Sequence, residues 1–249
     1  MKYQKTLKDL IEFIENVCKK TKINNVVLGI SGGIDSAVVA YLCKEAVQDK
    51  LFALLMPTKQ SNKENLSDAL MLCKKLNIKY QIIYIDDILQ NFEKVIQNPT
   101  QLRIGNLAAR VRMSLLYDYS ALHNALVIGT SNKSELMLGY GTIYGDLACA
   151  FNPLATLYKS EVFELAKFMG VHENFIKKAP SADLWPNQSD EKDLGYKYEI
   201  LDEVLKALEN NQSLENFDEN LKNLVLERVK NNAFKTKPPI TLKNFDDLA

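Results

Sequence analysis

The chain has 249 residues, with 31 lysines and arginines balanced by 31 aspartates and glutamates, and 47% of the residues are hydrophobic. This balance excludes a disordered or collagen-like chain, and the length allows one α/β domain with a sizeable core. Zero net charge argues against a general nucleic-acid binder. The absence of an apolar run near 20 residues and of a signal peptide predicts a cytoplasmic protein without a membrane partner.

Strand and helix patterns alternate along most of the chain. In order, they predict a strand at 25–30, a helix at 34–47, a strand at 51–56, a helix opened by a capping box at 61–64, a strand at 80–85, helices at 88–96 and 102–122, a strand at 125–129 and a helix that Ser160 caps and Gly170 ends. Alternation of this kind predicts a parallel sheet covered by helices on both faces. The last third is mostly helical, with a loop at 210–220, and residues 1–249 are expected to form a single domain.

Cysteine and histidine are sparse. The four cysteines lie far apart with no C-x-x-C pair, which favours reduced thiols, largely buried. The only histidines are His123 and His172, which argues against a histidine-built zinc site and against a Ser-His-Asp triad. Any chemistry is therefore expected to use side chains other than imidazole.

The strongest motif lies where the first strand ends and a helix begins. It consists of Gly29, Ile30, Ser31, Gly32, Gly33, Ile34, Asp35 and Ser36. Glycines let the backbone approach an anion, and the helix start offers N–H groups and the positive end of the helix dipole. The segment is predicted to be a phosphate cradle at the carboxyl edge of the sheet.

An acidic side chain in this cradle has a chemical consequence. Asp35 in the first helical turn would repel phosphate unless a cation stood between them, which is an argument for Mg²⁺. The plainer alternative is a glycine-rich turn in which Asp35 and Ser36 only stabilise the helix start. No lysine follows the glycines, so the motif is not a Walker A loop.

The run Ser-Gly-Gly-Ile-Asp-Ser at 31–36 resembles the signature of the pyrophosphate-loop ATPases, which split ATP between its α- and β-phosphates. Over nearly its whole length the chain also resembles the ammonia-dependent NAD⁺ synthetases of that superfamily. The segments that carry this second resemblance are 106–112 (NLAARVR), 129–135 (GTSNKSE), 144–146 (YGD), 152–154 (NPL) leading to Lys159, 180–184 (PSADL) and 188–191 (QSDE) followed by Leu194-Gly195.

The resemblance implies a Rossmann-like fold, as in the adenine nucleotide α-hydrolases, and a ligase reaction. The carboxylate of deamido-NAD attacks the α-phosphate of ATP, pyrophosphate leaves, and ammonia attacks the nicotinyl adenylate to give NAD⁺ and AMP, in the last step of NAD⁺ biosynthesis. Such a reaction needs charge neutralisation and alignment more than a resident nucleophile. The scarcity of histidine fits that demand.

The resemblance also implies residue roles on the ATP side. Asp35 and Glu135 match the carboxylates that hold Mg²⁺. Asp35 is expected to be catalytic because it would hold this ion. Thr130, Lys159 and Ser181 match positions that contact ATP. Taken alone, Glu135 would be a solvated surface residue, and Lys159 an exposed lysine before a helix.

On the dinucleotide side the match is less complete. Arg110 and Lys235 match deamido-NAD contacts, and Asp146 is a candidate to orient or deprotonate ammonium. The alternative for Arg110 is a surface position on a long helix. Arg112, two residues on, faces elsewhere on a helix and receives no role. Three positions depart from the pattern of some relatives, namely Ile143, Ala150 and Phe234.

The resemblance implies a homodimer, with deamido-NAD, ATP and ammonia as its partners. Glutamine-dependent relatives carry an amidohydrolase domain, for which 249 residues leave no room, so free ammonia is the expected nitrogen donor. Segment 181–194 is a candidate lid over the adenylate, with an ordinary surface loop as its alternative. Two other functions stay open: a different pyrophosphate-loop enzyme, such as a tRNA-modifying or GMP-forming one, and a noncatalytic nucleotide-binding module.

Overall fold

A parallel four-stranded sheet forms the centre of the protein. The computed structural model describes residues 2–185, 188–239 and 241. The strands are β1 (Asn25–Gly29), β2 (Leu51–Leu55), β3 (Lys79–Ile82) and β4 (Ala125–Val127), in the order β3-β2-β1-β4. In the register of the sheet, Val26 pairs with Leu51 and Asn25 with Ala125. The predicted α/β fold class is confirmed.

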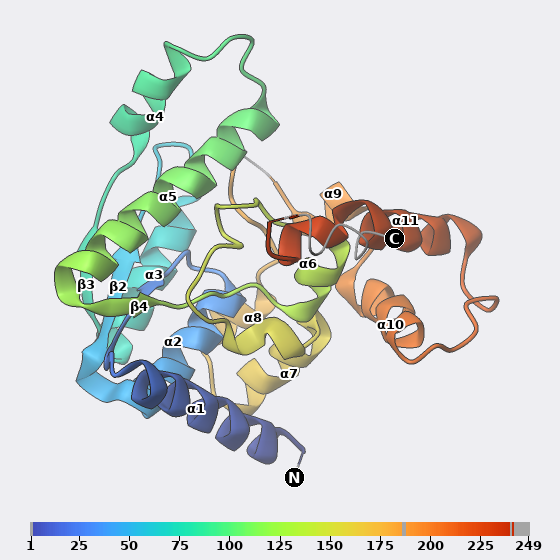
Figure 1. Cartoon of the computed structure of the whole chain (residues 1–249), viewed down its shortest axis with the longest axis horizontal. Helices are drawn as coiled ribbons and strands as arrows, with labels where there is room; N and C mark the ends of the chain where they lie inside the picture. Colours follow the sequence, from blue (N-terminus) through green and yellow to red (C-terminus); the bar gives the residue numbers. More distant parts are fainter. Residues whose placement is uncertain (1, 186–187, 240, 242–249) are drawn as a thin grey trace.

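Helices cover both faces of this sheet, as Figure 1 shows. Those described are α1 (Lys2–Thr21), α2 (Ile34–Val47), α3 (Lys63–Lys75), α4 (Asp86–Glu93), α5 (Gln101–His123), α6 (Lys133–Leu138), α7 (Lys159–Phe168), α8 (Glu173–Lys177), α9 (Asp190–Leu194), α10 (Tyr198–Glu209) and α11 (Glu219–Asn232). Short 3₁₀ turns lie at Gln48–Lys50, Pro153–Thr156 and Ala233–Thr236. Among the described residues, no helix is both long and apolar enough to cross a bilayer.

The central strand β1 is buried because it sends side chains into two cores. Val26 and Leu28 pack with α1, α2, α3 and α7, whereas Val27 points to the opposite core with α4 and α5. Successive residues of a strand face opposite sides, so an uninterrupted apolar run is what a strand covered on both faces requires. Three cysteines are buried in the first core, and all four are free thiols, as predicted.

The C-terminal helices have an apolar cluster of their own. Leu201 and Leu205 of α10 pack with Leu221 and Val225 of α11, and Leu138 of α6 joins them. In Figure 1, α10 and α11 lie at the right of the view, beyond α6 and α7 from the sheet. This placement brings α10 against α6 and α7, two helices that begin at the candidate site.

Several predicted boundaries were wrong. The strand predicted at 80–85 ends at Ile82, and Ile85 instead turns inward and precedes α4. β3 lies at the edge of the sheet, where four exposed residues give a weak burial signal. The cap of α3 is Asn62 rather than Ser61, because the Asn62 side chain accepts the Glu64 N–H.

The predicted cap of α7 was also wrong. Ser160 lies inside the helix, which begins at Lys159 after Tyr158, and Glu161 Oε2 accepts the Tyr158 N–H at 3.2 Å. A serine near a helix start resembles a cap in sequence. Here its backbone N–H is bound instead by Asp202, from α10.

Candidate functional site

The glycine-rich loop joins β1 to α2 at the carboxyl edge of the sheet. Gly32 has φ +85°, and a Cβ added there would lie 2.2 Å from the Asn65 carbonyl oxygen of α3. Only glycine combines a positive φ with so close a backbone neighbour. Gly33 is the capping residue before α2 and offers no side-chain hydrogen bond to the helix start, which suits an anion site there.

The two serines of the loop bind one another and the backbone. The Ser36 hydroxyl donates to the Gly33 carbonyl at 3.0 Å, and the Ser31 hydroxyl accepts the Gly33 N–H at 3.2 Å. The two hydroxyl oxygens lie 3.3 Å apart. The loop is therefore ordered by its own side chains.

A lysine joins the two acidic residues that the sequence singled out. The Lys159 ammonium lies 2.5 Å from Asp35 Oδ2 and 3.1 Å from Glu135 Oε1. Its side chain is only 2% exposed, whereas those of Asp35 and Glu135 are 17% and 15% exposed. The readings of Lys159 as an exposed lysine and of Glu135 as a solvated residue were therefore wrong.

Three helix N-termini create this cluster. Asp35 lies in the first turn of α2, Glu135 in that of α6, and Lys159 is the first residue of α7. Asn132 caps α6, forms a capping box with Glu135, and donates from its side chain to Asp35 Oδ1 at 3.0 Å. Parallel strands bring these helix starts to one edge of the sheet, which is why residues over 100 positions apart meet.

Electrostatics set the protonation of the cluster. Burial works to lower the pKa of Lys159, but Asp35, Glu135 and the nearby Asp190 outweigh it and hold that pKa above its ordinary value. Burial raises the pKa of Glu135, and the Lys159 charge opposes this shift. The lysine thus stays an ammonium ion between two partly desolvated carboxyl groups.

The other predicted ATP contacts lie on neighbouring segments. Thr130 follows the carboxyl end of β4, two residues before the cap Asn132. The Ser181 hydroxyl donates to the Gln188 carbonyl at 2.8 Å, and Asp183 accepts from the Asn62 N–H and the Asn65 side chain of α3. The segment of Ser181 therefore touches the helix that backs Gly32. Two residues of the candidate lid, Pro186 and Asn187, lie outside the described residues.

The predicted dinucleotide residues meet around the loop that carries Asp146. The exposed Arg110 of α5 donates from Nε to the Ile143 carbonyl at 3.2 Å, and the Lys235 ammonium binds the carbonyls of Gly139 and Gly141 at 2.8 and 3.3 Å. Asp146 Oδ1 accepts the Thr142 N–H at 3.0 Å. Desolvation raises the pKa of Asp146, although the residue remains in contact with solvent.

Sequence reasoning missed several residues here. Arg112 donates from Nε to the Met56 carbonyl at the end of β2, and burial lowers its pKa while Asp183 and Asp146 oppose the shift. Arg112 therefore lies near Asp183 and Asp146, a position that the sequence did not reveal. Asn132 was detectable from its position in Thr-Ser-Asn-Lys-Ser-Glu, a cap followed three residues later by glutamate.

Lys178 is another unpredicted member. Its ammonium donates to the Gly32 carbonyl at 3.3 Å and pairs with the buried Asp68 of α3, which also accepts from Asn174 at 2.9 Å. Burial works to raise the pKa of Asp68, but the hydrogen bonds from Lys178 and Asn174 outweigh it, so that pKa lies below its ordinary value. The pair links the back of the phosphate loop to α3.

A stability prediction follows from this pair. Replacing Asp68 by asparagine is expected to lower the free energy of unfolding at pH 7 by about 1–3 kcal/mol, because Lys178 loses its buried counter-ion. The wild-type contribution is present above the unfolded-state pKa of about 3.9 and disappears as pH falls through the lower folded-state pKa. Urea unfolding of both proteins should therefore show a difference at pH 7 that narrows below about pH 4. The exposed pair Glu173–Lys177 supplies the control: Glu173→Gln should leave stability unchanged.

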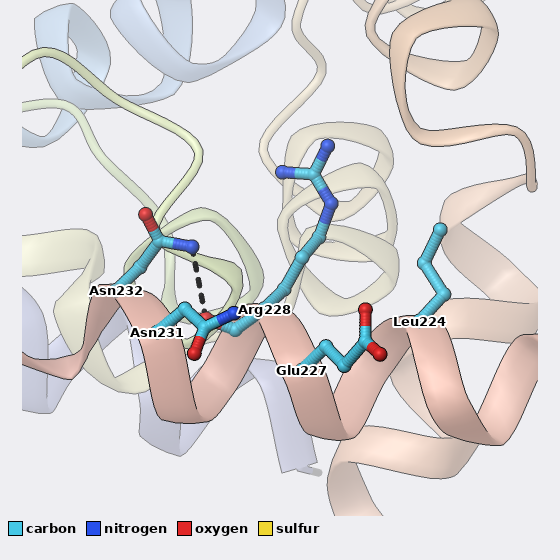
Figure 2. A pocket seen from close by; sticks show the side chains of 5 residues that line it. All are labelled: Leu224, Glu227, Arg228, Asn231 and Asn232. Atoms are coloured by element: carbon cyan, nitrogen blue, oxygen red, sulfur yellow. Dashed lines mark hydrogen bonds between the residues drawn. The ribbon is translucent and has the colours of Figure 1, made fainter.

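A hollow of about 370 Å³ lies on α11, next to the Gly139–Lys235 contact (Figure 2). Its lining residues are Leu224, Glu227, Arg228, Asn231 and Asn232. Figure 2 shows the Arg228 side chain extending from the helix, while the Asn232 amide donates to the Arg228 carbonyl at 2.9 Å. None of the predicted site residues lines it.

The parallel sheet, the uncapped glycine loop at its carboxyl edge and the carboxylate pair beside it define a Rossmann-like protein of the pyrophosphate-loop class. The profile of the NAD synthase family matches residues 6–239. The chain belongs to this family, which confirms the resemblance seen in the sequence.

Individual relatives agree with this assignment. An NH₃-dependent NAD⁺ synthetase of Campylobacter jejuni is 60% identical over 245 residues, which is 98% of this chain and all of the relative. A solved NH₃-dependent NAD synthetase of the same species, in complex with the nitrate ion, has a TM-score of 0.87 at 54% identity, covering 97% of this chain and 100% of the other. A solved NMN synthetase of Francisella tularensis has a TM-score of 0.88 at 32% identity, covering 96% and 98%.

Proposed function

We propose that this chain makes NAD⁺ from deamido-NAD, ATP and free ammonia, releasing AMP and pyrophosphate. The observation that carries the proposal is the cluster of Asp35, Glu135 and Lys159 at the mouth of the glycine loop. The names of the relatives with high identity over nearly the whole chain support the same reaction.

The loop and the lysine are suited to the first half of this reaction. A carboxylate oxygen of the nicotinate ring attacks the α-phosphorus, and the bond to the bridging oxygen breaks as pyrophosphate departs. The α2 N–H groups and the loop serines would hold the pyrophosphate, and the Lys159 ammonium would balance its developing charge. Thr130 and Ser181 would contact the ATP nucleotide from the neighbouring segments.

The donor set of the cluster also fits Mg²⁺. This ion is usually held by one or two carboxylates together with substrate phosphates, and Asp35 and Glu135 are two carboxylates that solvent reaches beside a phosphate loop. When bound, Mg²⁺ supplies charge neutralisation at the phosphates. We therefore assign Mg²⁺ binding to Asp35 and Glu135. The catalytic role proposed for Asp35 is to hold this ion.

For the dinucleotide, we assign Arg110 and Lys235 as contacts near the 139–146 loop. Both are cations, and a guanidinium and an ammonium suit phosphate or carboxylate groups. We also propose a homodimer. The support for it is that α5 exposes large apolar side chains, among them Leu102, Tyr117 and Leu122, to solvent in the single chain.

Asp146 is proposed to orient ammonium and to take up its proton before the nitrogen attacks the nicotinyl carbonyl. Asp146→Asn keeps the hydrogen bond from Thr142 but cannot accept that proton. The substitution is expected to raise the ammonia concentration needed for half-maximal rate about 10²-fold, with little change in the KM for ATP. An unchanged dependence on ammonia, measured at several pH values, would contradict the assignment.

One assay tests the function itself. The protein is incubated with ATP, Mg²⁺ and ammonium, and either deamido-NAD or nicotinate mononucleotide, and the products are separated chromatographically. NAD⁺ and AMP in equal amounts are expected with deamido-NAD. Nicotinate mononucleotide is included because the solved NMN synthetase has a TM-score of 0.88 to this chain, close to the 0.87 of the solved NAD synthetase. Absence of both NAD⁺ and AMP would overturn the proposal, and glutamine in place of ammonium should give no product.

A further inference from the structure

Asp202 is a buried carboxylate that no proposed step uses. It lies on α10, in the C-terminal helical part, and is fully buried. Its Oδ2 accepts the Ser160 N–H of α7 at 2.8 Å, and its Oδ1 accepts the hydroxyl of Ser134 on α6. One side chain therefore binds the first turns of two different helices.

Ser134 completes the connection. It is also fully buried, and its hydroxyl accepts the Lys159 N–H at 2.9 Å while donating to Asp202. Ser134 immediately precedes Glu135, and Ser160 immediately follows Lys159. The network thus fixes the backbone on both sides of the Lys159–Glu135 contact.

The physical logic favours a positioning function over a simple packing one. A buried charge is stable only when its oxygens receive hydrogen bonds, and N–H groups at helix starts lie at the positive ends of helix dipoles. Asp202 receives such hydrogen bonds from the start of α7 and from the start of α6, and it thereby connects the two helices. Those two starts carry a cation and a carboxylate 3.1 Å apart, a spacing that a small relative shift of either helix would break.

We propose that Asp202 and Ser134 are positioning residues that hold Lys159 and Glu135 in register for magnesium-bound ATP. Neither would touch the nucleotide; both act through the backbone of the two helices. Through them, the C-terminal helical part controls the ATP half of the site. The inference rests on the proposed function only in naming MgATP as the ligand.

The experiment compares wild type with Ser134→Ala and Asp202→Asn. Calorimetry measures MgATP binding without deamido-NAD, and steady-state rates give kcat/KM for ATP. Removal of such supporting hydrogen bonds is expected to weaken MgATP binding and kcat/KM by about 10- to 100-fold. The binding measurement needs no turnover, so it tests this proposal even if wild type were to make no NAD⁺.

The control is Asp218→Ala, which removes another aspartate whose side chain accepts a backbone N–H at a helix start. Asp218 accepts the Leu221 N–H at 3.0 Å at the start of α11, away from the cluster. Its loss should lower the melting temperature while MgATP affinity stays within about twofold of wild type.

A second control uses a protein that already carries Lys159→Ala and Glu135→Ala. In that protein, adding Ser134→Ala should weaken MgATP binding by less than about twofold further, because the residues that Ser134 positions are gone.

The outcomes are decisive in either direction. A loss of MgATP affinity in Ser134→Ala or Asp202→Asn, with the control unaffected, supports the proposal. Wild-type affinity and kcat/KM in both folded variants would overturn it, and so would an equal loss in the Asp218→Ala control. If Asp202→Asn does not fold, Ser134→Ala alone decides, since it removes only a hydroxyl.

Discussion

Replacing Lys159 by methionine is expected to reduce kcat/KM for NAD⁺ formation by about 10²- to 10³-fold, the range found when a single charge-stabilising donor is removed from an active site. Methionine fills a similar volume without the ammonium group. Asp35 and Glu135 would then lose the ammonium group that both contact, and the departing pyrophosphate would lose a counter-charge. Rates are measured by separating NAD⁺ from deamido-NAD at several ATP concentrations.

Lys133 provides the matched control. It is the first residue of α6, as Lys159 is of α7, but it pairs with Glu209 rather than with the two site carboxylates. Lys133→Met should keep kcat/KM within about threefold of wild type, because partly exposed ion pairs contribute little. Equal rates for Lys159→Met and Lys133→Met would show that the buried lysine has no special role in turnover.

Gly32→Ala is the second substitution with a large expected effect. The new Cβ would meet the Asn65 carbonyl oxygen at 2.2 Å, and alanine would also have to adopt φ +85°. The positive φ alone costs about 1–2 kcal/mol, and the clash requires the loop or α3 to move. We expect a loss of about 3 kcal/mol or more in unfolding free energy and little remaining activity.

Substitutions at two other glycines distinguish the cost of the positive φ from the cost of the steric clash. Gly170 has φ +69° with no atom near an added Cβ, so Gly170→Ala should cost only the conformational part, about 1 kcal/mol, and leave activity unchanged. Gly33 has a negative φ, and its added Cβ would meet only the Ser31 hydroxyl, at 3.3 Å. Urea unfolding should rank the three variants Gly32, Gly170, Gly33 from most to least destabilised. A Gly32→Ala variant as stable as Gly170→Ala would refute the clash.

Much of the ATP side could be predicted from local pattern. Alternating strands and helices predict a parallel sheet, and the rule that ligands bind at the carboxyl ends of strands places Asp35 and Glu135 at one edge. The structure brings them to a common lysine, in agreement with that expectation. Local spacing sufficed here because each residue lies within a few positions of a strand end.

Other features depend on contacts between distant segments, so local pattern could not reveal them. Ser160 looks like a cap in sequence, yet Asp202 from α10 binds its N–H, and only the folded chain brings the two together. Helix geometry shows that Arg112 points away from Arg110, but it does not reveal that Asp183 lies close enough to influence the Arg112 charge. The edge strand β3 was predicted too long because the apolar run continues to Ile85, which is buried outside the strand.

The contacts made by residues 232–235 have a consequence for synthesis on the ribosome. Asn232 packs against Gly139, and Lys235 binds the carbonyls of Gly139 and Gly141, so the loop of Asp146 gains part of its support from residues synthesised long after the loop itself. By contrast, Asp35, Glu135 and Lys159 are all present far earlier in a nascent chain. A growing polypeptide thus acquires the nucleotide cluster and its Asp202 support before the loop proposed to orient ammonium gains its contacts with residues 232–235, so the two halves of the site are completed at different times.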